Sequence, residues 1–237
     1  MNKFGLPWRE WSHSEIMILV LLLVIAGGAT CFVRIADWVK DQDIQGFDET
    51  VLRGLRNPDN PSVPIGPRWV GDVARNITAL GSVPVLMLLV ISVSGFLYLL
   101  GKRHAMVFLI LCVVGGVILT VVLKEGFDRA RPDIVPKLEA VTSASFPSGH
   151  SMMSAVVYLT LSVMVAGVFA SMRVRVYVIC VAVAVSLLVG LSRMFLGVHY
   201  PSDVLAGWTV GFGWSISCWI TAKILQRKGT LEGGAIQ

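Results

Sequence analysis

The chain has 237 residues, of which 55% are hydrophobic and only 15% are charged. A soluble domain carries about 25% charged residues, so this composition excludes an ordinary soluble protein and favours one that is embedded in a membrane. The formal net charge is +5, but the basic residues lie at the ends of apolar segments and in short loops, a distribution that does not indicate nucleic-acid binding.

Six nearly uncharged stretches divide the chain, and each reaches the roughly 18–20 residues that a helix needs to cross the hydrocarbon core. They cover about residues 16–33, 78–100, 105–123, 150–171, 174–191 and 202–222. Backbone groups in lipid must be satisfied internally, and continuous hydrophobicity is not the alternating pattern of a barrel strand, so each stretch is predicted to be a helix. The sequence therefore predicts an all-α integral membrane protein, with six transmembrane helices in one bundle and a single domain over residues 1–237.

The first stretch could also belong to a signal peptide, because Ala26-Gly27-Gly28-Ala29 has the small residues of a cleavage site. However, it is long for the apolar part of a signal peptide, and the polar residues before it carry both signs of charge. We therefore expect a retained first helix.

Residues 34–76 form the longest polar segment, and they include two apolar repeats at four-residue spacing. The repeats are Phe47, Val51 and Leu55, and then Trp69, Val73 and Ile77. This spacing is typical of amphipathic helices, so we expect two short helices at the membrane interface, separated by a proline-rich loop. They would either cover the bundle or form a lid over the path by which a lipid enters. The next transmembrane helix is predicted from about Asn76 to Leu100.

The first group with candidate chemistry is Lys124 and Arg131, which follow the 105–123 stretch. Seven residues correspond to two helical turns, so both cations can face the same side if the helix continues past Gly126 toward Pro132. Two cations on one side are suited to hold a phosphate. The simpler alternative is that Lys124 is a lysine at a helix end whose ammonium group reaches the membrane surface.

The second group is Pro147-Ser148-Gly149-His150, directly before the fourth apolar stretch. Ser148 is suited to cap a helix that begins at Gly149 or His150, and the free N–H groups of such a helix start attract an anion. Gly149 allows the backbone to approach a ligand closely, and His150 can donate a proton to a leaving oxygen. The alternative is an ordinary capped loop with a histidine at the membrane interface.

The third group is Ser192-Arg193 with His199 and Asp203, between a helix predicted to end near Leu191 and one predicted to begin at Pro201. Asp203 falls in the first turn of the last helix, where its carboxylate can accept a hydrogen bond from one imidazole nitrogen of His199. The other nitrogen is then left basic. The alternative is that Asp203 only complements the positive end of the helix dipole.

The last helix also contains a Gly-x-x-x-Gly step at Gly207 and Gly211. Small residues at this spacing allow two membrane helices to pack closely. We therefore expect another helix to lie against this face.

Six spans place both termini on one side of the membrane and all three groups on the other side. Short turns on the terminal side carry dense positive charge at Lys102-Arg103 and at Arg173 and Arg175. Because Lys and Arg in short loops are retained in the cytoplasm, we expect cytoplasmic termini and an extracytoplasmic site in the plasma (inner) membrane. The total number of Lys and Arg is slightly larger on the opposite side, but that number includes the candidate site residues.

Together the three groups resemble the tripartite signature of the type-2 phosphatidic acid phosphatase superfamily, at the internal spacing of that family. The matching residues are Lys124 to Arg131-Pro132, Pro147-Ser148-Gly149-His150, and Ser192-Arg193 with His199 and Asp203. Residues 78–82, Thr-Ala-Leu-Gly-Ser, also look like a sequence that is common in bacterial members. The resemblance covers about residues 70–225.

This resemblance implies a role for each matching residue. His199 attacks phosphorus and forms a phosphohistidine, Asp203 orients His199, and His150 protonates the leaving group. The phosphoryl oxygens are held by the cations and the helix start, namely Lys124, Arg131, Ser148, Gly149 and Arg193. Three cations can neutralise the charge of the transition state, and we see no carboxylate cluster in the sequence suited to Mg²⁺, so we expect no metal and no cofactor.

We therefore expect a lipid phosphatase whose partners are the bilayer, water and a lipid phosphate such as phosphatidic acid, phosphatidylglycerophosphate, undecaprenyl diphosphate or lipid A. The motifs recognise phosphate, so they do not select the head group, the lipid tail or the oligomeric state. One alternative is a phosphotransferase that passes the phosphoryl group to a lipid hydroxyl. Another is a transporter, but transporters place charges near the middle of the bilayer and carry internal repeats, whereas these charges lie at helix ends.

Overall fold

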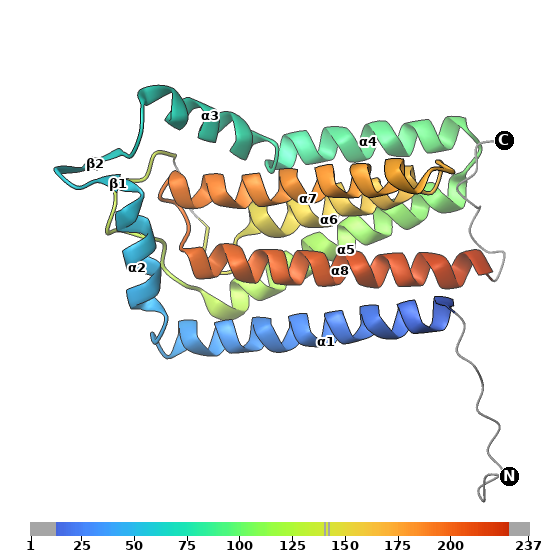
Figure 1. Ribbon diagram of the computed structural model, residues 1–237, viewed down its shortest axis with the longest axis horizontal. Coiled ribbons are helices and arrows are strands. Elements are labelled where there is room, and N and C mark those ends of the chain that lie inside the picture. Colours follow the sequence, from blue (N-terminus) through green and yellow to red (C-terminus); the bar gives the residue numbers. More distant parts are fainter. Residues whose placement is uncertain (1–12, 140, 142, 228–237) are drawn as a thin grey trace, which may run out of the picture.

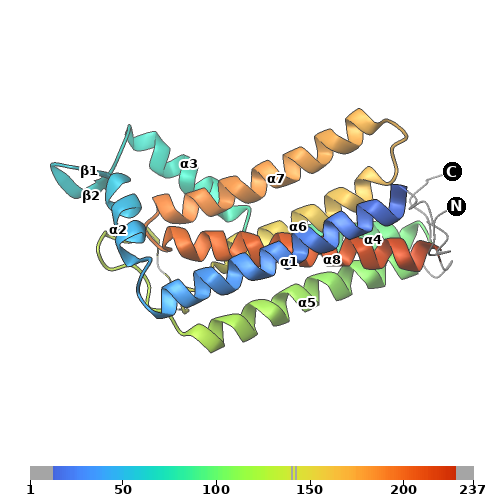
Figure 2. The same cartoon turned by 60° about the horizontal axis from the view of Figure 1, so that its bottom comes forward.

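The computed structural model describes residues 13–139, 141 and 143–227. Long helices run side by side, and a group of short elements covers one end of them (Figures 1 and 2). In chain order the elements are α1 (His13–Lys40), α2 (Gln45–Gly54), β1 (Arg56–Asn57), β2 (Asn60–Pro64), α3 (Arg68–Ala79), α4 (Val83–Leu99), α5 (Arg103–Phe127), α6 (Gly149–Ala166), α7 (Met172–Phe195) and α8 (Pro201–Arg227). The two strands pair antiparallel as a small hairpin. The predicted all-α class is confirmed.

Four of the described helices, α1, α5, α6 and α7, are long and apolar enough to cross a bilayer. The bent pair of α3 and α4 adds a fifth candidate span if it is counted as one. α8 has 27 residues and runs beside these helices, but its serine, threonine and tryptophan side chains make it less apolar (Figure 1). The structure thus gives four to five candidate spans in the described chain, and the number six stays a prediction.

The predicted continuous helix from Asn76 to Leu100 is wrong. The chain forms α3 and α4 as two helices with an angle of 44° between them. Pro84 stands in the first turn of α4, where its missing N–H costs nothing, but its ring would clash with the carbonyl of Leu80 if the helix were continuous. The residues of the break pack on the bundle, since a Cβ on Gly81 would lie 2.5 Å from Val189.

The two predicted short helices exist as α2 and α3, and their apolar repeats do not face the protein. Phe47 is 51% exposed and Trp69 is 63% exposed, whereas the residues that face the protein are Asp48 and Leu52 in α2 and Ala74 and Thr78 in α3. In water an apolar stripe is expected to be buried. Beside a membrane the apolar stripe can face lipid, and polar side chains can then face the protein interior.

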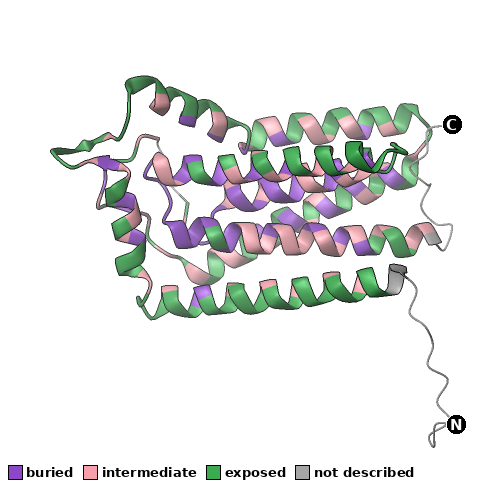
Figure 3. Cartoon of the chain, viewed as in Figure 1, coloured by how far each residue is buried: buried purple, intermediate pink, exposed green. Residues whose placement is uncertain are grey.

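The most buried part of the protein lies where α6, α7 and α8 meet, at the end that carries the short elements (Figure 3). The Gly-x-x-x-Gly step brings α8 against α6, as predicted. A Cβ on Gly207 would lie 2.7 Å from the carbonyl oxygen of Ser148, and one on Gly211 would lie 2.6 Å from that of Met152. α6 begins at Gly149 and α8 at Pro201, as predicted, and their close approach places the two helix starts side by side.

We predict that Gly211→Ala will lower the stability of the protein by about 1 kcal/mol or more, because its methyl group meets the backbone of α6. The matched control is Gly213→Ala on the same helix, where a Cβ has nothing within 4 Å. That control should be neutral or slightly stabilising, because alanine is a better helix former. Thermal unfolding of the two purified variants in detergent measures the difference. Equal melting temperatures would show that the step does not set the helix spacing.

Candidate active site

The residues of the three sequence groups gather at one end of the bundle, from four helix ends and the loop between α5 and α6 (Figure 1). Lys124 lies in the last turn of α5, and Arg193 lies in the last turn of α7. Ser148 precedes α6, His199 lies in the turn before α8, and Asp203 lies in the first turn of α8. The start of α1 and the end of α8 lie at the opposite end of the bundle from these residues.

His199 and Asp203 form a buried pair. The distance from His199 Nδ1 to Asp203 Oδ2 is 3.4 Å, and the exposed fractions of the two side chains are 1% and 0%. Asp203 Oδ2 also accepts hydrogen bonds from the backbone N–H of Tyr200 at 2.9 Å and from the hydroxyl of Ser145. These donors fix the carboxylate in position, and the carboxylate in turn favours the tautomer of His199 with its proton on Nδ1.

Arg131 lies on the other side of the imidazole, with Nη1 3.2 Å from His199 Nε2. The same guanidinium donates to the carbonyl oxygens of Val198 at 2.8 Å and Ser143 at 2.6 Å. The helix does not continue to Arg131, because α5 ends at Phe127 and Asp128 takes a left-handed conformation with φ 40°. Arg131 reaches the site from the loop instead, so its position depends on its contacts with the loop and with the α7–α8 turn.

The start of α6 lies against the same site. Ser148 accepts a hydrogen bond from the hydroxyl of Ser151 at 2.9 Å, and its own N–H donates to the backbone carbonyl of Asp203 at 2.9 Å. Gly149 lies beside Lys124, because a Cβ on this glycine would be 3.4 Å from Lys124 Cε. The ammonium of Lys124 donates to the carbonyl oxygen of Ala144. The capped helix start predicted from Ser148 is therefore present, with a lysine next to it.

Arg193 is almost completely buried and binds two groups that the sequence did not suggest. Its Nη1 donates to the hydroxyl of Thr78 at 3.0 Å, and it forms an ion pair with Glu139. Its Nε has no hydrogen-bond partner among the described residues. Thr78 belongs to the Thr-Ala-Leu-Gly-Ser segment, so this segment contributes to the site from the break between α3 and α4. Glu139 has no local signal that would have identified it.

Sequence reasoning also missed the ion pairs behind Asp203. Arg129 Nη1 lies 2.6 Å from Asp203 Oδ1, and Arg129 Nη2 lies 2.8 Å from Asp48 Oδ2. The guanidinium carbon of Arg129 is 4.3 Å from the centre of the Tyr200 ring. Asp48 is fully buried and accepts the backbone N–H of Ser202 at 2.9 Å. The short helix α2 is therefore joined to the start of α8 by a buried carboxylate.

Burial in this network shifts the pKa values of the loop residues. Burial lowers the pKa of the His199 imidazole to about 4, although the hydrogen bond and the negative charge of Asp203 act to raise it. His199 is therefore neutral at pH 7. Burial also lowers the pKa of Arg129, but the carboxylates of Asp203 and Asp48 outweigh burial, so the pKa of Arg129 is raised overall. Arg129 stays charged between its two partners.

Residues 105–227, just over half of the chain, match the family described as the PAP2 superfamily. The chain belongs to the PAP2 superfamily. It is 32% identical over 183 residues to phosphatidylglycerophosphatase B of Bacillus subtilis (strain 168). The match covers 76% of this chain and 85% of that protein. The crystal structure of the first transmembrane PAP2 type phosphatidylglycerolphosphate phosphatase from Bacillus subtilis is similar, with a TM-score of 0.76 and 26% sequence identity. That likeness covers 86% of this chain and 98% of the solved chain.

A second curated relative is the lipid A 1-phosphatase of Rhizobium johnstonii, 33% identical over 133 residues. That match covers 52% of this chain and 49% of the relative, so this chain spans about half the length of the Rhizobium protein. Together these findings identify the chain as a membrane-embedded PAP2 phosphatase, and they confirm the family and the enzyme class that the sequence predicted. Asp48 and Thr78 lie outside the matched residues, so the PAP2 region here is joined to partners from the preceding segment.

We predict that Asp48→Asn will destabilise this PAP2 phosphatase by about 3 kcal/mol, because it leaves Arg129 with one buried carboxylate fewer. Asp48 contacts Arg129 and Ser202, neither of which is among the residues expected to bind phosphate. The variant should therefore lower kcat more than it changes KM. The matched control is Glu49→Gln, since the side-chain hydrogen bonds of the neighbouring Glu49 are with Gln45 and Arg53 of α2 itself. Thermal unfolding and steady-state kinetics measure both effects. An Asp48→Asn variant that behaves like Glu49→Gln would contradict the role of this ion pair.

We also predict that His199 stays neutral at pH 5, where a free imidazole is mostly protonated. The native pKa lies below that of the unfolded chain, so the native state should lose stability as the pH falls from about 6.5 toward 4. Nitrogen NMR of histidine-labelled protein in detergent, with His199→Gln to assign the signals, measures the protonation state. A His199 signal that titrates near pH 6.5 would contradict the burial of this pair.

Proposed function

We propose that this PAP2 phosphatase hydrolyses the terminal phosphate of a membrane lipid phosphate through a phosphohistidine on His199. The observation that carries the proposal is the buried His199–Asp203 pair, in which His199 Nδ1 faces the carboxylate and the unprotonated Nε2 lies 3.2 Å from Arg131 Nη1. A neutral imidazole with one nitrogen held by a carboxylate is a nucleophile at its other nitrogen. Because His199 Nε2 lies next to the guanidinium of Arg131, the cation attracts the phosphoryl group to the nitrogen that attacks it.

In the first step, His199 Nε2 forms a bond to phosphorus and the bond from phosphorus to the lipid oxygen breaks. His150, at the start of α6, gives a proton to that oxygen. In the second step, His150 takes a proton from water, the water oxygen bonds to phosphorus, and the P–N bond breaks. Inorganic phosphate leaves, and both histidines return to their initial states.

The phosphoryl oxygens are bound by Lys124, Arg131, Arg193 and the Ser148–Gly149 helix start. Arg193 supports this assignment, because a buried N–H without an acceptor is costly and an oxyanion supplies one. Substrate must also compete with Glu139 for the guanidinium of Arg193. Three cations and the helix start supply the positive charge that phosphoryl transfer needs, so we propose that the reaction requires no metal.

The position of the site at the end of a membrane bundle supports a substrate whose acyl chains remain in the bilayer. Among lipid phosphates we propose phosphatidylglycerophosphate first, because the relative matched over 85% of its length is named a phosphatidylglycerophosphatase. At the other end, Lys102 lies in the α4–α5 connection, and Arg103 and Arg173 lie in the first turns of α5 and α7. Their positive charge supports a plasma-membrane orientation with this end in the cytoplasm and the site on the extracytoplasmic face.

The test is release of inorganic phosphate by purified protein in EDTA, from phosphatidylglycerophosphate, phosphatidic acid, undecaprenyl diphosphate and lipid A. We expect wild type to act fastest on phosphatidylglycerophosphate, and His199→Ala to lose at least about 10³-fold because the nucleophile is absent. The matched control is His104→Ala, a histidine in the first turn of α5 at the other end of the bundle, which should keep its activity.

Brief reaction with phosphate-labelled substrate should leave label on wild type that survives alkali but not acid, and none on His199→Ala. Full activity of His199→Ala would refute the proposal that His199 is the nucleophile. Loss of activity in EDTA would refute the metal-free reaction. Label transferred to a lipid acceptor instead of water would identify a phosphotransferase.

A further inference from the structure

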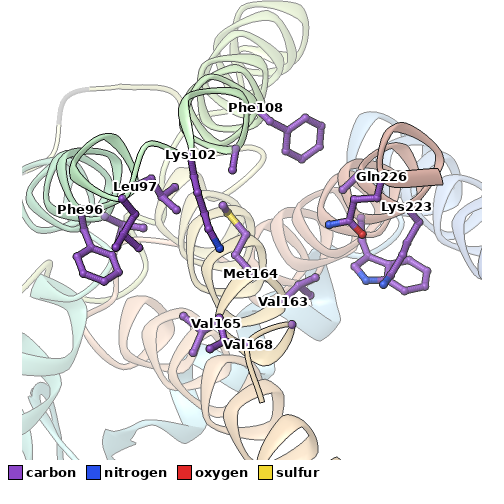
Figure 4. Close-up of a pocket in the computed structure, with 16 residues that line it drawn as sticks. Phe96, Leu97, Lys102, Phe108, Val163, Met164, Val165, Val168, Lys223 and Gln226 are labelled. Atoms are coloured by element: carbon purple, nitrogen blue, oxygen red, sulfur yellow. The ribbon is translucent and has the colours of Figure 1, made fainter. Parts of the chain in front are cut away.

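A cavity lies at the opposite end of the bundle from His199, lined by residues of α4, α5, α6 and α8 (Figure 4). Its volume is about 220 Å³. Most of its lining is apolar, from Phe96, Phe108, Met164 and Trp219 among others. A cavity with this lining is suited to hydrocarbon and not to a free ion.

The charged residues of the lining are both lysines. Lys102, Lys223 and Gln226 contribute, and the lining contains no Asp or Glu among the described residues. Lys102 extends from the start of α5 toward Met164 in the space between the helices (Figure 4). It is half-buried, and its ammonium has no hydrogen-bond acceptor or acidic partner in the described part of the chain. A lysine ammonium beside an apolar cavity, with no anion next to it, is suited to an anionic ligand.

Lys223 lies on the other wall, with its ammonium 5.8 Å from the centre of the Trp219 ring. The cavity therefore has an apolar interior and two cations from different helices, α5 and α8, at the end of a membrane bundle. An anionic phospholipid has the complementary form: an acyl chain for the interior and a phosphate for the two lysines. Basic pockets between transmembrane helices recognise anionic lipid head groups in this way.

We propose that this cavity is a binding site for an anionic phospholipid of the leaflet at this end, with part of an acyl chain in the cavity and its phosphate on Lys102 and Lys223. The site is separate from the catalytic end and does not depend on the reaction proposed above. The bound lipid joins the α4–α5 connection to the ends of α6 and α8. Because it binds only the folded protein, it should raise the melting temperature.

The experiment is native mass spectrometry of delipidated His199→Ala protein, titrated with phosphatidylglycerol or with phosphatidylcholine of the same acyl chains. The catalytic variant is used so that turnover cannot change the lipid. The test variant adds Lys102→Gln and Lys223→Gln. The matched control adds Arg103→Gln and Arg173→Gln, which remove the same charge at the same end, because neither arginine lines the cavity. The melting temperature of each variant without lipid checks that it is folded.

We expect the protein to retain phosphatidylglycerol in preference to phosphatidylcholine, and the double lysine variant to bind phosphatidylglycerol roughly 30-fold more weakly. The arginine control should bind it nearly as well as the parent. Val163→Phe, which adds bulk to the cavity wall without removing charge, should also weaken binding. Equal retention of the two lipids would refute recognition of the anionic head group. Equal loss in the lysine and arginine variants, or no loss in either, would refute the assignment to this cavity.

Discussion

The buried carboxylate of Asp203 is the group on which the catalytic end depends. A charge in an apolar interior is tolerated only when other groups surround it with hydrogen bonds and opposite charge. Here the partners come from the loop before α6, through Arg129 and Ser145, and from the α7–α8 turn, through His199 and the N–H of Tyr200. The polar end therefore assembles around a single carboxylate, and the position of His199, the proposed nucleophile, follows from the same contacts.

The apolar bundle serves as the rigid support for this network. Because glycine at 207 and 211 brings α8 against α6, the backbone carbonyl of Asp203 accepts the N–H of Ser148, and the start of α8 lies against the turn proposed to bind phosphate at the start of α6. Trp208 reinforces this arrangement by donating its ring N–H to the carbonyl of Ser186 in α7. Steric contact between helices thus determines the geometry of chemistry that occurs at their ends.

The short elements between α1 and α4 are part of the site and not only a cover. Asp48 in α2 holds Arg129, Thr78 in α3 binds Arg193, and Arg56 donates to the carbonyl of Phe195 at the end of α7. Each contact joins the polar segment to the loop before α6 or to the end of α7, where the proposed site residues lie. A change of lipid packing around α2 and α3 would therefore act on the site through these contacts.

The sequence by itself determined the membrane class, the three polar groups, the helix starts at Gly149 and Pro201, and the close packing at Gly207 and Gly211. These features depend on local chemistry, namely the length of the apolar stretches, a capping serine, a proline in the first turn and glycines that have no side chain. Only the tertiary structure decided that Arg131 reaches His199 from a loop and that Asp48, Thr78 and Glu139 join the site. These contacts connect residues that are 50 or more positions apart. Helical periodicity identified α2 and α3 but did not show which face is buried, because in a membrane protein lipid accepts the apolar face and leaves the polar face for the interior.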